Sequence, residues 1–295
     1  MWIKIPYKVW EYYRGMFRRH KKSKQTRRAR GKRRTRKQRG GNTKTIDLVI
    51  ARYKESLSWI DTYKDRGFST IHIYTKSDKP ISCPKFDTAS HTKCAIHKIK
   101  NVGVCDHTYL YHIVHSYDKL ADLTVFAPGS ADMDFKKMIL DSTLDRVFQN
   151  RNTVLNVFRF DIGVGEAMYN FTMEKYPTAY VANRDGANEE VPQKLADVRP
   201  FGEWYAKNFP GAQPKEASFF GIMAVSREHI HRRPKSFYEN LLKQVGTDKF
   251  HEASHFVERS YPAMFHPLPP EAYNMSDIMQ KKIGIDQGGY KVLRR

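Results

Sequence analysis

The sequence has 295 residues, a formal net charge of +21 at pH 7 and three cysteines. This length can bury a sizeable core in one or two domains, and the chain has no run of 18 apolar residues that would indicate a membrane-spanning protein. We find no signal peptide, and an odd number of cysteines without framework spacing favours a reducing compartment. We therefore expect an intracellular protein that is not secreted, cytoplasmic with a nuclear or membrane-peripheral location as alternatives.

The positive charge belongs to an N-terminal arm. Residues 1–44 hold 18 Lys and Arg against one Glu, whereas the rest of the chain holds 34 basic and 30 acidic residues. Residues 1–17 interleave aromatic and basic side chains, as in a helix that lies on an anionic membrane or docks on the body. Residues 18–41 are low-complexity and cationic, so we expect disorder there. Through residues 1–44 we expect non-specific binding to a polyanion, either nucleic acid or anionic membrane.

A folded α/β domain is predicted over residues 45–270. A buried strand at 46–51, a short helix at 55–63 and a strand at 70–75 form a unit of the kind that builds parallel sheets. The same criteria predict strands at 95–99, 123–126, 154–158 and 219–225, helices at 135–148, 234–245 and 248–261, an insertion or active-site cover at 159–200, and a peripheral tail at 271–295. The fold class is therefore α/β, with a mostly parallel central sheet flanked by helices.

The stretch 101–134 is the centre of the predicted domain. It contains a loop, a helix with Asp106 as its predicted N-cap, a buried strand, and a turn that carries Asp132 and Asp134. Ligands of open α/β sheets bind beyond the carboxyl ends of the strands, where these two carboxylates fall. We therefore expect the functional site at this edge.

Four segments carry a resemblance to a known family. They are IARYKESLSWI, NVGVCDHTYLYHIVHSYDKLADLTVF, FFGIMAVSREHIHRRPKSFYENLL and HFVERSYPAMF. Over residues 46–266 the chain is similar to a family of bacterial and fungal proteins that is catalogued only as a domain of unknown function and that looks like the A-type, nucleotide-sugar glycosyltransferases. The chain departs from the family at 127–131, where histidines and a tryptophan are frequent, and at Asp106, where Glu is usual.

The resemblance implies a donor site and a metal. Glycosyltransferases of this fold hold Mn²⁺ or Mg²⁺ through an Asp-x-Asp pair next to the donor's diphosphate, and Asp132-Met133-Asp134 supplies hard oxygen ligands in that form. The alternative is that both aspartates stabilise the N-terminus of the following helix. The donor-binding residues that the resemblance implies are Arg52, Glu55, Trp59, Asn101, Gly103, Asp106, His107 and Arg227. For Glu55 and Trp59 the alternatives are a helix first-turn charge and a core position.

An inverting sugar transfer also requires a carboxylate base for the acceptor hydroxyl. Glu258, in the segment FVERSY, matches the family's motif and is the predicted base, and Arg259 is predicted to neutralise the leaving phosphate. A salt bridge between the two that only orients their helix is the alternative. The sequence thus predicts a metal-assisted transferase that moves a sugar from a nucleotide-sugar donor to a hydroxyl of a glycan or protein acceptor.

Two other functions remain open. His251 and His255 belong to the sequence HEASH, which has the H-E-x-x-H form of zinc peptidases; alternatively both lie on the polar face of a helix. A zinc site built from Cys83, Cys94 and His97 fits no common ligand spacing. The other possibility is a non-catalytic, transferase-like scaffold that residues 1–44 tether to nucleic acid or membrane.

Overall fold

The computed structural model describes residues 44–86, 90–159, 166, 168–173 and 194–274. The chain divides into two units, residues 1–43 and residues 44–295, and only the second contains described residues. The predictions for the arm therefore lie outside the described residues, apart from Lys44. The same is true of most of the predicted cover at 159–200 and of residues 275–295.

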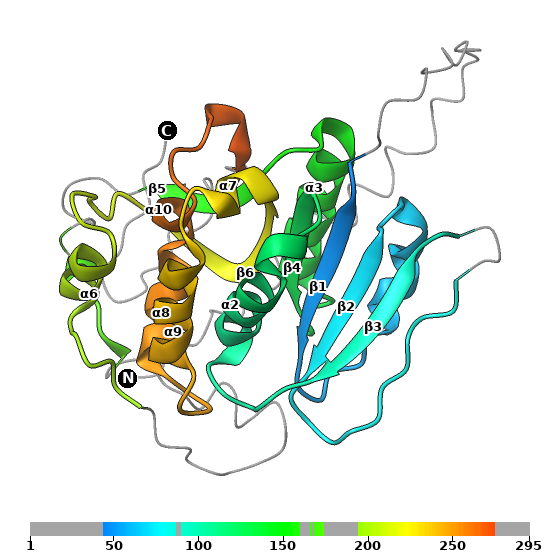
Figure 1. Ribbon diagram of the computed structural model, residues 1–295, viewed down its shortest axis with the longest axis horizontal. Helices are drawn as coiled ribbons and strands as arrows, with labels where there is room; N and C mark the ends of the chain where they lie inside the picture. The colour runs from blue at the N-terminus through cyan, green and yellow to red at the C-terminus, as the bar shows by residue number, and fades with distance from the viewer. Residues whose placement is uncertain (1–43, 87–89, 160–165, 167, 174–193, 275–295) are drawn as a thin grey trace, which may run out of the picture. The chain divides into compact units, whose positions relative to one another are not determined.

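A seven-stranded mixed sheet forms the centre of the domain (Figure 1), with the strand order β3-β2-β1-β4-β6-β5-β7. The strands are β1 (Ile46–Arg52), β2 (Thr70–Thr75), β3 (Lys93–Lys98), β4 (Leu123–Pro128), β5 (Val154–Arg159), β6 (Glu216–Ser226) and β7 (Tyr273–Asn274). The first four are parallel, β6 is antiparallel to β4 and β5, and β7 is parallel to β5. The predicted fold class, a mostly parallel α/β sheet, is confirmed.

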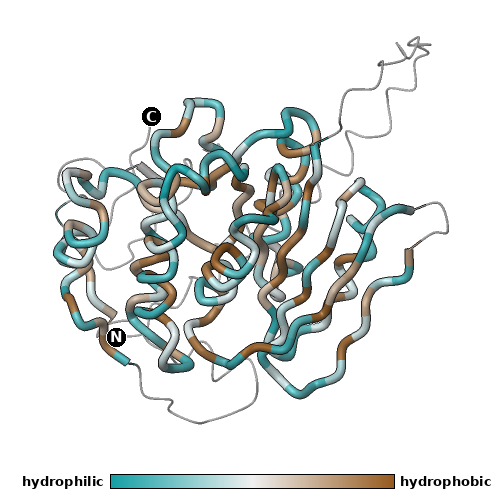
Figure 2. The backbone as a smooth tube through the Cα atoms, viewed as in Figure 1, coloured by the Kyte–Doolittle hydropathy of each residue, from teal (hydrophilic) through white to brown (hydrophobic). Residues whose placement is uncertain are grey.

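The middle strands of this sheet are buried on both faces. Every residue of β4 is buried, and so is every residue of β1 except Asp47. This explains why both segments are continuous apolar runs in the sequence, since a strand covered on both faces has no solvent side. Figure 2 shows the hydrophobic residues running along these strands.

Helices cover both faces of the sheet. On one face, α2 (Val104–Ser116), α6 (Phe201–Asn208), α8 (Lys235–Val245) and α9 (Glu252–Arg259) share an apolar core. On the other, α3 (Asp134–Asn150) and the 3₁₀ helix η1 (Ser58–Thr62) share a second core. Val49 belongs to the first core and its neighbours Leu48 and Ile50 to the second, because successive strand residues point to opposite faces. The remaining short helices are η2 (Lys64–Arg66), η3 (Tyr117–Lys119), α7 (Arg227–His231), α10 (Tyr261–Met264) and η5 (Pro270–Ala272).

Several element boundaries differ from those predicted. The helix expected at 248–261 is two helices, α9 and α10, because Pro262 at the start of α10 has no N–H to continue the first one. The helix expected at 55–63 is the shorter η1, and α6 was not predicted. Strand β7 lies within the predicted peripheral tail, so the sheet extends to Asn274, beyond the predicted domain boundary at 270.

Cys83 and Cys94 form a disulfide, with their Cα atoms 6.0 Å apart. The number and spacing of the cysteines gave no disulfide framework and favoured a reducing compartment, so this pair was not predicted. The bond also occupies both sulfurs of the cysteine and histidine set considered as a zinc site. None of the helices in the described part of the chain is both long and apolar enough to span a bilayer.

Candidate functional site

Two acidic side chains, Asp106 of α2 and Glu258 of α9, belong to one largely buried cluster. Asp106 is 2% exposed, and its carboxylate accepts a hydrogen bond from the hydroxyl of Tyr261. Its other oxygen lies 3.6 Å from the thiol of Cys105. The prediction that Asp106 caps its helix is wrong, because α2 begins at Val104 with Gly103 as the N-cap. The side chain of Asp106 is therefore available to the cluster.

The backbone of β6 holds Glu258. The N–H groups of Phe220 and Gly221 donate hydrogen bonds to its carboxylate. These two residues have left-handed φ angles of 73° and 62°, close to the point where the register between β5 and β6 shifts. That conformation takes their N–H groups out of the regular ladder. Unlike Asp106, Glu258 keeps 17% of its side-chain surface exposed.

Burial raises the pKa of Asp106, and the negative charge of Glu258 raises it further. Burial also raises the pKa of Glu258, against the opposing charges of Arg259 and Lys136 and the two backbone N–H groups. Two carboxyl groups that repel each other in a poorly solvated site do not ionise independently, so they hold a proton to higher pH than exposed ones. Such a pair can exchange a proton closer to neutral pH.

A buried lysine fixes the turn that leads into α2. Lys76, at the end of β2, donates from Nζ to the carbonyl oxygens of Val102, at 2.6 Å, and Val104. Gly103 and Val104 both have left-handed φ angles, 56° and 43°, which is strained for a β-branched residue. Burial lowers the pKa of Lys76 to about 8, although the charges of Cys105 and Asp106 favour its charged form. The turn and its lysine thereby set the position of Asp106.

The loops that follow β1 and β4 meet at the carboxyl edge of the sheet. The indole N–H of Trp59 donates to the carbonyl oxygen of Gly129 at 2.9 Å. A Cβ placed on Gly129 would come within 2.9 Å of a carboxylate oxygen of Glu55, so the two loops approach closely and a larger residue would require Glu55 to move. Trp59 is buried in the second core, which is the alternative to donor binding that was considered for this residue.

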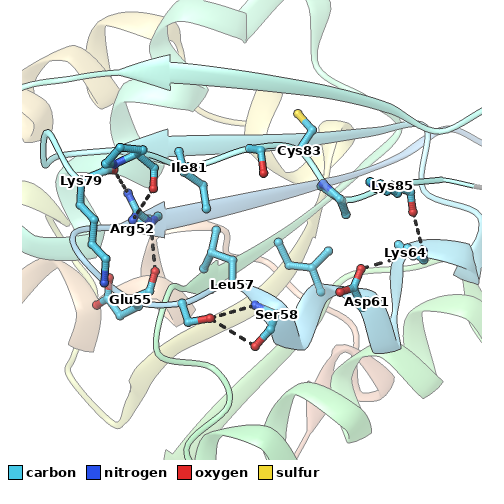
Figure 3. A pocket seen from close by; sticks show the side chains of 15 residues that line it. Arg52, Glu55, Leu57, Ser58, Asp61, Lys64, Lys79, Ile81, Cys83 and Lys85 are labelled. Carbon is cyan, nitrogen blue, oxygen red and sulfur yellow. Dashed lines mark hydrogen bonds and ion pairs between the residues drawn. The ribbon is translucent and has the colours of Figure 1, made fainter.

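Arg52 organises the loop after β2. It is 2% exposed and donates to the hydroxyl of Thr75 at 2.8 Å and to the carbonyl oxygens of Glu55 and Lys79 at 3.0 and 3.1 Å. Arg52 and Glu55 also line a pocket of about 610 Å³ between η1 and residues 79–85 (Figure 3). The predicted donor residues Arg52, Glu55 and Trp59 therefore come together at one edge.

The structure separates Arg227 from these residues. Because β6 is antiparallel, its last residue pairs with the first residue of β4, at the opposite edge of the sheet. Arg227 follows there and forms a salt bridge with Asp122, whose carbonyl also accepts from the Arg227 N–H at 3.0 Å. Arg227 therefore lies at the edge of the sheet opposite the other predicted donor-binding residues.

Arg259 lies in a buried position beside Glu258. It is 3% exposed and lies over the ring of Phe171, 4.0 Å from its centroid. It donates to the carbonyl oxygen of His255 at 2.9 Å and lies 3.9 Å from the carboxylate of Glu258. It is therefore a buried positive charge beside Glu258, and its role toward a leaving phosphate stays a prediction.

Two further predicted donor residues lie beside the turn before α2. His107 is buried, and burial, together with the charges of Lys76 and His115, lowers its pKa to about 3, so its ring is neutral. Asn101 is partly exposed at the start of the turn. Both residues are near the carbonyl oxygens of Val102 and Val104, which Lys76 binds.

The Asp-x-Asp pair follows β4 at the carboxyl edge. Asp132 is exposed in the turn, and Asp134 is the first residue of α3, whose N-cap, Met133, makes no side-chain capping bond. Lys136, the third residue of α3, donates from Nζ to the hydroxyl of Ser130 at 2.9 Å. Its positive charge also lowers the pKa of Glu258. The turn and Glu258 are thus close to each other.

The segment HEASH is part of the fold of α9. His251 precedes the helix and caps it, since its Nδ1 accepts from the N–H of Ala253 at 3.1 Å. Glu252 is fully buried and accepts from the N–H groups of Met173 and Ala196 at 2.7 and 3.0 Å and from Arg199. Within the described ranges there is no group of three or more His, Cys, Asp or Glu side chains that could hold a metal ion.

Sequence reasoning missed Tyr261, Lys76 and Lys136. Tyr261 lies three residues after Glu258, a spacing that could have suggested a shared site. Lys76 and Lys136 have no such indication, because only the fold brings them to the carboxylates. These three residues supply the hydroxyl and the positive charges around the pair.

The fold and the site define a mixed α/β protein with a buried carboxylate pair at the carboxyl edge of its sheet. Residues 48–276 match the family described as "protein of unknown function (DUF3431)", and the chain belongs to this family. No curated protein matches the sequence.

Proposed function

We propose that this protein is a glycosyltransferase that moves a sugar from a nucleotide-sugar donor to an acceptor hydroxyl, with Glu258 as the base. The observation that carries the proposal is the carboxylate pair of Glu258 and Asp106 beside the loops that follow β1 and β4. The mostly parallel α/β sheet is also the fold class that the resemblance to A-type glycosyltransferases implies.

Glu258 has the properties that a general base requires. Its raised pKa makes it a stronger base than an exposed carboxylate, and part of its side chain is exposed on the side from which an acceptor hydroxyl would have to approach in this proposal. The N–H groups of Phe220 and Gly221 fix its orientation. Asp106 contacts Tyr261 instead of solvent, so its role is to raise the proton affinity of the pair.

The donor would bind at the carboxyl edge. The pocket that Arg52 and Glu55 line has room for a nucleoside. Asp132 and Asp134 follow the end of β4 at the same edge of the sheet. A Mg²⁺ or Mn²⁺ ion bound to phosphates needs only one or two protein carboxylates, so the Asp-x-Asp pair fits such an ion. When bound, the ion would neutralise charge on the diphosphate leaving group.

A non-catalytic scaffold is the competing function. The enclosure of the pair favours it, since Asp106 is 2% exposed and Tyr261 occupies one of its oxygens. A buried acidic pair of this kind also occurs as a structural network. The two functions differ in what happens to the donor after it binds.

The test is Glu258→Gln, which keeps the shape of the side chain and removes its basicity. With a panel of UDP- and GDP-sugars, mixed glycan acceptors and Mg²⁺, we expect release of nucleoside diphosphate to fall about a hundredfold or more. The rise in melting temperature caused by the donor should persist, because binding does not use the base.

Glu228→Gln is the matched control, since Glu228 is 79% exposed on α7 and remote from the carboxyl edge. It should leave both measurements unchanged. If the wild-type protein binds donors without releasing nucleotide, the scaffold function replaces the transferase. If Glu258→Gln keeps full turnover, Glu258 is not the base.

A further inference from the structure

Residues 79–85 form one wall of the pocket that faces η1 (Figure 3). This wall follows β2 and is neither helix nor strand. Within the described part of the chain, no backbone N–H of residues 77–86 donates to a backbone carbonyl. A segment with so few internal hydrogen bonds opens at low cost unless other contacts hold it.

Non-covalent contacts hold the two ends of the wall. Arg52 donates to the carbonyl oxygen of Lys79 at 3.1 Å, and Lys64 donates to the carbonyl oxygen of Lys85. Between these ends, Ile81 packs against the second core. Lys64 and Lys85 lie at the surface, where such a contact is weak.

The middle of the wall has a covalent tie. Cys83, which lines the pocket, is bonded to Cys94 in the edge strand β3. Both residues are partly exposed, so a soluble reductant can reach the bond. The third cysteine of the chain, Cys105, lies in the carboxylate cluster.

We propose that the Cys83–Cys94 disulfide is a redox-sensitive latch that holds the pocket wall closed, so that reduction opens the pocket and weakens nucleotide binding. The ligand in this proposal rests on the proposed function; the latch itself does not. A dithiol supplies two electrons and two protons: the bond between the sulfurs breaks, two cysteine thiols form, and the dithiol becomes a cyclic disulfide. Reoxidation restores the closed wall.

Two measurements on the full chain test the latch. The first is trypsin cleavage after Lys85, followed by mass spectrometry; we expect reduction with dithiothreitol to speed it about tenfold or more. The second is the affinity of the protein for UDP and GDP in the presence of Mg²⁺, and we expect this affinity to fall about tenfold on reduction. Mg²⁺ is used because it is a hard ion that dithiols bind weakly.

The matched control is the double variant Cys83→Ser, Cys94→Ser. Without reductant it should behave like the reduced wild-type protein in both measurements, and dithiothreitol should not change it further. Equal cleavage of oxidised and reduced wild-type protein would overturn the latch. If neither nucleotide binds in either state while cleavage still depends on reduction, the latch stands and the proposed function fails.

Discussion

At the scale of single residues, the notable feature is that the fold keeps two acidic groups where charge is poorly solvated. Burial and mutual repulsion raise the pKa of Asp106, so the folded protein binds its proton more tightly than the unfolded chain does. Between the ordinary carboxyl pKa and the raised one, folding therefore takes up protons. The free energy of unfolding must then fall as pH rises through this window.

Asp106→Asn should reduce this fall. Asn cannot ionise, yet its side-chain oxygen can still accept from Tyr261, so the contact survives while the titration is lost. From about pH 4 to about pH 8 we expect the decline in the free energy of unfolding to be about 1–3 kcal/mol smaller than in the wild-type protein. Urea unfolding at each pH measures it.

Asp122→Asn is a control with the opposite sign. Hydrogen bonds from Thr45 and the charge of Arg227 lower the pKa of Asp122, so its contribution to stability is present above the ordinary carboxyl pKa and is lost as pH falls. The variant should lose stability at neutral pH and differ little from wild type in acid. If Asp106→Asn shows the same pH dependence as the wild-type protein, the carboxyl group titrates normally.

At the scale of elements, the strands could be predicted and their directions could not. β1 and β4 are apolar runs because both faces are buried, so their apolar composition predicts them as buried strands. The reversed direction of β6 cannot be predicted in this way, since the hydropathy of a segment does not depend on chain direction. The misplacement of Arg227 follows from this, because the reversed strand delivers it to the far edge. Asp106 and Glu258 were each identified, but their meeting depends on how α2 packs against α9.

The turn before α2 is an element whose geometry depends on one glycine. A Cβ on Gly103 would lie 2.2 Å from the carbonyl oxygen of Val245 at the end of α8, and the residue has a φ of +56°. Gly67 is also left-handed, with a φ of +94°, but a Cβ there would meet nothing within 4 Å. The two glycines therefore separate backbone strain from steric clash.

Gly67→Ala should cost about 1–2 kcal/mol, the price of a left-handed alanine. Gly103→Ala should cost at least about 2 kcal/mol more, because the backbone of α8 must also move away. Chemical denaturation of both variants measures the difference. Equal losses of stability would mean that the contact between the turn and α8 relaxes freely, and that the position of Asp106 is less constrained than we infer.

At the scale of the whole molecule, the sequence separates a basic arm from a nearly neutral body. The body has its own two cores and begins at Lys44, whose carbonyl oxygen accepts from the side chain of Arg151 at 2.8 Å. Removal of residues 1–43 leaves this contact in place. Folding and polyanion binding should therefore respond differently to the loss of the arm.

Deletion of residues 1–43 should leave the melting temperature of the body nearly unchanged. Binding to duplex DNA, RNA or anionic vesicles should fall at least about tenfold at physiological salt, with a shallower salt dependence, because fewer counterions are released. A titration of fluorescent DNA at several salt concentrations measures both quantities. Undiminished binding by the truncated protein would place the polyanion site on the body.

The pairing of β5 with β7 also determines when the sheet can be completed. Leu155 pairs with Tyr273, and the amide of Asn274 donates to the side chain of Asn156 at 2.7 Å. Contacts this distant in sequence close slowly, because a long loop must be ordered before they form. During synthesis, β5 leaves the ribosome long before its partner and waits with one edge unpaired. The sheet is therefore completed only after the long intervening segment has been made, and the unpaired edge of β5 exposes the nascent chain to aggregation in that interval.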